Sequence, residues 1–296
     1  MRRRRFARPP GAERSELGAI AFDMARGAFE NPGMTRRNAG GSARSCWATG
    51  VFLVGIGFLA VGRQASLQAG EALPPIKKLV QRHIRAMGGE KVLSAFVTRH
   101  FQGEAMGDFL PQTGKLEYYA KAPNKRLSIV EIPQFGQVRS GFDGKCAWTH
   151  NPGMGVVEEK GELLERSKRD ADFYRDLHLL KLYPDLKVVR ADKAGGEPVW
   201  VAESRPTANT TRRFYFSQKT ALLVREEAET KISGGVNRVR VDASDFRKVD
   251  GILFPFKMDI VTELPYQPPI KLAIRVRKME HNIKIPDGMF EPPKSE

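Results

Sequence analysis

The stretch KVDGILFPFKMDI, residues 248–260, predicts a β-strand with two different faces. Its apolar residues recur at every second position, namely Ile252, Phe254, Phe256, Met258 and Ile260. Lys257 and Asp259 fall between them. Because successive side chains of a strand point to opposite faces, one face of this strand is apolar and the other is mostly polar.

Two short features of the same stretch bear on its surroundings. Asp250-Gly251 is typical of a tight hairpin turn with positive φ. Pro255 has no amide hydrogen to donate, so it fits an edge or a bulge better than a regular central position. The stretch is therefore expected to be the second strand of a hairpin.

The same alternation continues along most of the chain, separated by turn residues. We expect strands near residues 97–104, 114–122, 126–132, 136–142, 145–150, 185–191, 198–204, 210–217, 221–229, 235–247, 252–263 and 270–281. Consecutive strands joined by short turns form an antiparallel meander. A twisted sheet of this size curls, and one of its faces is apolar while the other is charged.

Two segments have helical spacing instead. Residues 75–87 carry an apolar stripe that ends at Gly88-Gly89, and residues 161–182 form a second helical insertion. The predicted fold is mainly β: an incomplete antiparallel β-barrel, with a curled sheet of about 10–12 strands, whose open side is covered by the N-terminal helix and the mid-chain insertion.

The N-terminal quarter is expected to direct the chain to the cell envelope. Residues 46–62 contain no charge and follow the basic stretch TRRNAGGSAR, which is the order of a secretory signal. We therefore assign residues 34–70 to a signal peptide and predict a periplasmic protein. The alternative is an uncleaved helix at 46–62 that anchors the chain in the inner membrane. Residues 1–33 are then either a disordered tail or an extension upstream of a true start at Met34, and residues 71–296 form one β-barrel domain.

The charge distribution argues against nucleic-acid binding. The net charge is +15, of which about half lies before residue 70. Beyond that point, acidic and basic residues are interspersed, as in VREEAETK, which is typical of a solvated surface.

The sequence offers no catalytic or metal-binding set. The five histidines have no metal-ligand spacing. Cys146 and His150 lie four residues apart on one expected strand, about 13 Å by the strand rise, which is too far for a nucleophile and its base. Asp170, Asp172 and Asp176 alternate with basic residues and are interpreted as a solvated helix face. We predict a non-enzymatic protein without a cofactor or metal.

The motifs FRKVDGILFPFKMDI and HNIKIPDGMFEPP, with the basic signal and the Gly-Gly helix stop, resemble the outer-membrane lipoprotein-sorting proteins of the LolA/LolB-like superfamily. The resemblance covers residues 75–293. It implies an incomplete antiparallel barrel closed by helices, in which the carrier branch of the family binds lipid acyl chains. The lipidated branch has a cysteine directly after its signal, and this chain lacks one. The motif near the end is expected to tuck the C-terminal tail over the sheet edge, with its bend at residues 286–288.

These observations predict a periplasmic carrier that binds a hydrophobic ligand, either a lipid or a lipoprotein acyl chain. Envelope membrane proteins are further candidate partners. A sheet of about twelve strands is wide enough to enclose a cavity, whereas eight strands are just filled by side chains. The candidate lining residues are Tyr118, Trp200, Phe214, Phe216, Phe254, Phe256, Met258, Leu272 and Ile274. The alternative is a cell-envelope scaffold or interaction module with a filled core and no ligand.

Overall fold

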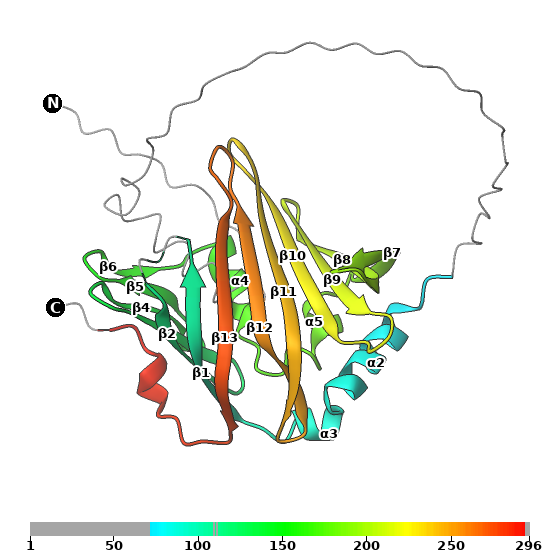
Figure 1. Ribbon diagram of the computed structural model, residues 1–296, viewed down its shortest axis with the longest axis horizontal. Helices are drawn as coiled ribbons and strands as arrows, with labels where there is room; N and C mark the ends of the chain where they lie inside the picture. The colour runs from blue at the N-terminus through cyan, green and yellow to red at the C-terminus, as the bar shows by residue number, and fades with distance from the viewer. Residues whose placement is uncertain (1–71, 109, 111, 294–296) are drawn as a thin grey trace, which may run out of the picture. The chain divides into compact units, whose positions relative to one another are not determined.

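The computed structural model describes residues 72–108, 110 and 112–293, and shows one large antiparallel sheet with a few short helices (Figure 1). The segments predicted as residues 1–33 and 34–70 lie outside this range. Among the described residues, no helix has both the length and the apolar character needed to cross a membrane.

The elements follow the order expected from the alternation of apolar residues. The strands are β1 (Thr98–Gly107), β2 (Gly114–Lys121), β3 (Lys125–Ile132), β4 (Gly136–Phe142), β5 (Ala147–Asn151), β6 (Gly155–Glu158), β7 (Lys187–Ala194), β8 (Glu197–Thr207), β9 (Thr210–Ser217), β10 (Leu223–Ile232), β11 (Gly235–Val249), β12 (Ile252–Glu263) and β13 (Ile270–His281). The helices are α2 (Ile76–Met87), α3 (Glu90–Leu93), α4 (Glu162–Asp170) and α5 (Leu179–Leu182), with the 3-10 turn η1 (Asp287–Phe290).

The sheet is a meander whose first and last strands meet in its middle. Its order is β6-β5-β4-β3-β2-β1-β13-β12-β11-β10-β9-β8-β7, and all pairs are antiparallel. The end strands β6 and β7 are not paired with each other, so the curled sheet stays open, which confirms the predicted incomplete barrel. The sheet has 13 strands, one more than the twelve expected from the sequence. The additional strand is β6, which pairs with β5. Its four residues, GVVE, are too short to show alternation.

The opening stretch forms the predicted hairpin. Val249 pairs with Ile252 across a two-residue turn, in which Asp250 has φ 51° and Gly251 has φ 93°. Positive φ at both positions is the geometry that Asp-Gly favours. Pro255 pairs with Phe246 of β11 but precedes the section of β12 that pairs with β13, so at this level β12 has a partner on one side only.

The mid-chain insertion is broken, contrary to the expected helix over 161–182. It forms α4 and the four-residue α5, separated by residues 171–178, which we call the crossing segment. Asp172 explains the break, because its side chain accepts a hydrogen bond from the Tyr174 amide at 2.9 Å. A short polar side chain that bonds the nearby backbone competes with helix continuation.

Helix α2 ends against the hairpin turn. Gly88 has φ 131°, and a Cβ added there would lie 2.5 Å from the Gly251 carbonyl oxygen. Only glycine allows the helix end and the turn to approach this closely.

We expect Gly88→Ala to lower the free energy of unfolding by more than about 1 kcal/mol, since both the backbone conformation and the contact oppose a side chain. Gly89→Ala is the matched control, because Gly89 also has positive φ (87°) but open space around it. Urea denaturation of both variants measures the difference. Equal losses in the two would show that the contact with Gly251 contributes nothing.

The C-terminal tail crosses the outer face of β1–β5, where the sequence had suggested the sheet edge. Lys121 Nζ donates to the Ile285 carbonyl at 2.9 Å, and Trp148 Nε1 donates to the Phe290 carbonyl at 2.9 Å. Leu127, Trp148, Ile285 and Phe290 form a buried cluster there. The outer face of this half of the sheet is therefore covered by the tail, because Leu127 and Trp148 make it apolar.

Candidate functional site

The nine predicted lining residues all lie on the inner face of the sheet, and all are buried, but they fall into two clusters. Tyr118, Phe254, Phe256, Met258, Leu272 and Ile274 belong to the first cluster. Trp200, Phe214 and Phe216 belong to the second. The two clusters differ in what faces them.

The first cluster forms what we call the apolar wall, which spans β11, β12, β13, β1 and β2 and extends into β3 and β4. Its rows follow the strand register, so that Met258 pairs with Ile274 and Ile274 pairs with Ala105. Among its buried members, Phe173 of the crossing segment is the one residue that does not come from a strand. The described helices therefore supply almost no apolar surface to match this wall.

The second cluster is packed in the ordinary way. Trp200, Phe214 and Phe216 contact side chains of α2 and α5, including Leu79, Val80 and Leu179. Tyr183, directly after α5, stacks edge-on against Phe214 with ring centroids 5.1 Å apart. The structure thus places these three predicted lining residues under helices.

The crossing segment spans the inner face between two distant parts of the sheet. At one end the Phe173 amide donates to the Pro123 carbonyl, in the turn between β2 and β3, at 2.9 Å. At the other end Arg175 Nη2 donates to Glu226 Oε2, on β10, at 2.7 Å. Figure 1 shows the two helices that flank this segment, α4 behind the long strands β12 and β13 and α5 beyond β11, toward β9.

A buried ionic cluster fixes the Arg175 end of the crossing segment. The sequence analysis did not predict this cluster. Glu226 also accepts a hydrogen bond from Arg212 Nη2 at 3.3 Å, and Arg212 Nη1 lies 3.7 Å from Asp170 Oδ1. The side chains of these four residues are at most 6% exposed. The interpretation of Asp170 as part of a solvated helix face is therefore wrong.

Burial and neighbouring positive charges shift the pKa values of Asp170 and Asp176 in opposite directions. Burial raises the pKa of Asp170 despite the nearby arginines. Burial would also raise the pKa of Asp176, but the hydrogen bond and charge of His83 and the charge of Arg175 outweigh it and lower that pKa to about 2. Asp176 is therefore ionised throughout the physiological range.

His83 ties α2 to the crossing segment. Its Nδ1 lies 3.1 Å from the Ala221 carbonyl oxygen, and its Nε2 lies 3.4 Å from Asp176 Oδ1. Both neighbours are acceptors, so both hydrogen bonds form together only when the imidazole carries two protons. The helix and the segment are thus joined by polar contacts of one imidazole as well as by packing.

The alternation of inward and outward positions along β9 could have predicted that Arg212 is buried. Arg212 shares its strand face with Phe214 and Phe216, so the alternation places it inside. Its type argued for the surface, since arginine is rarely buried without a partner. Its partner Glu226 lies on the next strand, β10, but Asp170 comes from α4, a part of the chain that the sequence does not bring to β9.

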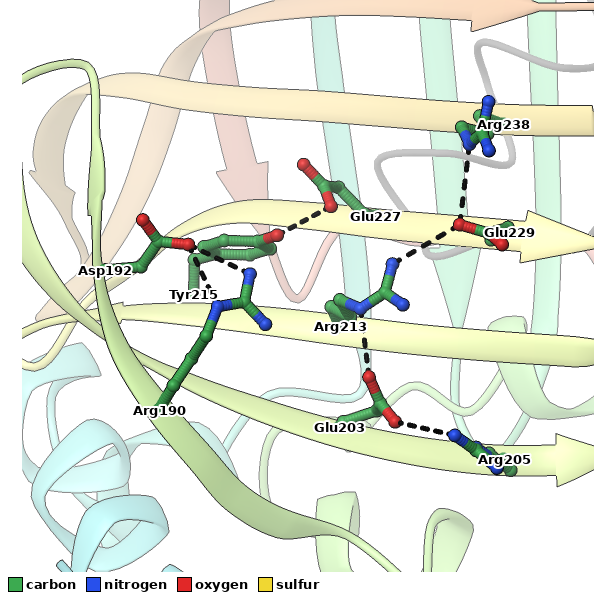
Figure 2. Close-up of polar contacts among 9 residues, drawn as sticks. All are labelled: Arg190, Asp192, Glu203, Arg205, Arg213, Tyr215, Glu227, Glu229 and Arg238. Atoms are coloured by element: carbon green, nitrogen blue, oxygen red, sulfur yellow. Dashed lines mark hydrogen bonds and ion pairs between the residues drawn. The ribbon is translucent and has the colours of Figure 1, made fainter. Parts of the chain in front are cut away.

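The outer face of β7–β11 carries a different polar network (Figure 2). Arg213 contacts Glu203 at 3.0 Å and Glu229 at 3.5 Å, and Glu229 also contacts Arg238 at 3.4 Å. A hollow of about 170 Å³ lies among Arg213, Glu227, Glu229, Arg238, Arg240 and Glu263.

Charges on this outer surface are balanced. Tyr215 donates to Glu227 Oε2 at 2.6 Å, and burial together with this bond raises the pKa of Tyr215. Arg190 pairs with Asp192 at 2.9 Å. Because the acids and bases drawn in Figure 2 neutralise one another, this face offers little attraction for a charged ligand.

The predicted absence of a metal site can be compared with the geometry only over the described residues. Within them, no three His, Cys, Asp or Glu side chains are grouped so that they could hold a metal ion. Cys146 is exposed and has no disulfide partner. The apolar wall is therefore the main candidate site.

Comparison with known proteins places the fold. No family model and no curated protein matches the sequence. Among solved structures, a DUF1329 family protein from Desulfovibrio piger ATCC 29098 matches with a TM-score of 0.50 and 14% identity, over 73% of this chain and 97% of that chain. A domain assigned to outer membrane lipoprotein sorting, from Vibrio parahaemolyticus, matches with a TM-score of 0.50 and 11% identity, over 72% and 94% of the two chains. A LolA superfamily protein from Nitrosomonas europaea is also similar, with a TM-score of 0.49 and 12% identity, over 74% and 98%. The first two matches confirm, at the level of fold, the resemblance that the sequence motifs predicted.

Proposed function

We propose that this chain, which has the fold of the lipoprotein-sorting domain, is a non-enzymatic binding protein of the periplasm that holds the hydrocarbon of a lipid or of a lipoprotein against its apolar wall. The observation that carries the proposal is the composition of that wall, whose buried members come from strands apart from Phe173. An apolar surface that the helices of residues 72–293 do not match with a layer of their own is suited to an apolar ligand. The expected export signal at residues 34–70 supports the location.

The energetics are adequate for binding. Ten buried methylene groups would contribute roughly 8 kcal/mol. Association costs about 4–15 kcal/mol, so a ligand with one or more long chains is needed. Movement of the crossing segment, which is fixed by the Phe173–Pro123 and Arg175–Glu226 contacts, would admit such a chain.

A scaffold with a filled core remains the second candidate, and two observations favour it. Trp200, Phe214 and Phe216 are packed under helices rather than left facing a hollow. Strand β7 is an end of the sheet, and most of its residues are exposed, so a partner could pair with it by strand addition.

Replacing Ala105 with a large residue distinguishes the carrier from the scaffold. Ala105 is fully buried on β1 in the middle of the apolar wall. If a ligand occupies the space before the wall, Ala105→Phe is expected to weaken binding of the apolar fluorophore N-phenyl-1-naphthylamine at least about tenfold while the protein stays folded. If the core is filled, the same change is expected to lower the free energy of unfolding by about 1–3 kcal/mol through overpacking.

The matched control is Ala273→Phe, since Ala273 lies on the neighbouring strand β13 and on the opposite, half-exposed face. It should alter neither binding nor stability. The measurement uses the full chain after removal of lipid and detergent, by fluorescence titration and by urea denaturation. A wild-type protein that neither binds the fluorophore nor releases lipid on solvent extraction would rule out the carrier.

A further inference from the structure

The inner face changes from apolar to polar at one side of the apolar wall. Across β2 to β5, one row of paired residues consists of Tyr118, Ser128, Ser140 and Thr149. All four are buried and all four carry a hydroxyl group. Tyr118 belongs to the apolar wall, and Val130 and Val138 of the wall lie two residues from Ser128 and Ser140, so this hydroxyl row runs along the margin of the wall.

Arg126 lies beside the hydroxyl row. It is two residues before Ser128 on β3, on the same strand face, and is 3% exposed. Its Nε atom has no hydrogen-bond partner, and neither does Thr149 Oγ1 of the row, over the part of the chain that the structure describes. Buried donors without a partner are rare in native proteins, and they indicate a missing ligand, ion or water.

One acid that senses the charge of Arg126 is Asp170, at the end of α4. Asp170 is shared with Arg212, whose Nη1 lies 3.7 Å from it, and burial raises the pKa of Asp170. A buried guanidinium is stable when an anion accepts its hydrogen bonds.

We propose that the ligand is an anionic amphiphile, whose carboxylate or phosphate head binds Arg126 and the hydroxyl groups of Ser128 and Thr149 while its hydrocarbon chain lies along the apolar wall. This inference rests on the binding function proposed above and names the class of ligand. The register places the two parts of the site side by side, because Tyr118 of the wall pairs with Ser128 of the hydroxyl row. A guanidinium beside hydroxyl donors is suited to both kinds of anionic head.

The test compares ligands that share a chain of sixteen carbons and differ in the head. The full chain, freed of lipid, is loaded with N-phenyl-1-naphthylamine and titrated with palmitate, hexadecyl phosphate, hexadecanol or inorganic phosphate. Palmitate or hexadecyl phosphate should displace the fluorophore at a concentration at least about tenfold lower than hexadecanol does, since the bond to a charged head is the stronger one. Whichever of the two anionic compounds displaces it better identifies the head.

The variant Arg126→Gln should remove most of this preference and leave hexadecanol affinity unchanged. Thr149→Val should reduce the preference about two- to threefold, and it keeps the proposal testable if Arg126→Gln does not fold. Arg240→Gln is the matched control, because Arg240 is exposed on the outer face of β11 and should change nothing.

Each remaining outcome overturns a defined part of the argument. Equal displacement by hexadecanol and by both anionic compounds, or an equal loss of all three in Arg126→Gln, would reject the anionic head while the apolar site stands. Displacement by inorganic phosphate alone would reject the amphiphile in favour of a free anion. Absence of fluorophore binding in the wild-type protein would reject the proposed function and this inference together.

Discussion

Replacing Glu226 with glutamine is expected to lower the free energy of unfolding by about 3–5 kcal/mol, because it removes the negative charge from a buried ion pair. Glu226 accepts hydrogen bonds from Arg175 at 2.7 Å and Arg212 at 3.3 Å, and its side chain is 3% exposed. Without its charge, two buried guanidinium groups share less compensation. Urea denaturation of the full chain measures the loss.

An exposed pair of the same kind provides the control for this prediction. Glu104 accepts two hydrogen bonds from Arg277 on the outer face, where their side chains are 35% and 68% exposed. Glu104→Gln should cost less than about 1 kcal/mol, as surface pairs do. If the two variants lost similar amounts, the ionic cluster would have to be reached by water, and the crossing segment would not seal it.

The second large effect is expected at the C-terminal tail. Phe290→Ala should lower the free energy of unfolding by about 3–5 kcal/mol, since a fully buried aromatic ring is lost from the cluster with Leu127, Trp148 and Ile285. The emission of Trp148, whose Nε1 donates to the Phe290 carbonyl, should shift towards that of a solvated indole as the tail loosens.

Tyr266→Ala is the comparison for the tail variant, because Tyr266 is 94% exposed and loses an aromatic ring without losing burial. Its stability should stay within about 0.5 kcal/mol of the wild type. A loss below about 1 kcal/mol in Phe290→Ala would mean that the tail adds little to the outer face of β1–β5.

The strand pattern was the most predictable part of the fold. Alternation at Phe254, Phe256 and Met258 reports which face is buried, because a strand has a period of two wherever it lies. Asp250-Gly251 likewise fixed a turn through local backbone preference alone. Strand β6 escaped prediction because four residues are too few to show a period.

The candidate site was less predictable. The nine candidate lining residues share the inner face, and their role as ligand contacts stays a prediction. The sequence did not separate those under helices, such as Trp200 and Phe214, from those of the apolar wall. Their local patterns are the same. The buried charges of Arg212, Asp170 and Glu226 were missed because a charged side chain predicts exposure until its partner is known.

The sequence by itself determined the class of fold, the order of most strands and the hairpin at residues 250–251, since these depend on neighbours a few positions apart. Tertiary structure alone decided that the first strand, β1, pairs with the last, β13, in the middle of the open sheet. It also decided which face the tail covers and which charges are buried together. Those features join residues far apart in the chain, and their energies exist only once the sheet has curled. The division between the apolar wall and the hydroxyl row, on which the proposed ligand depends, belongs to this second group.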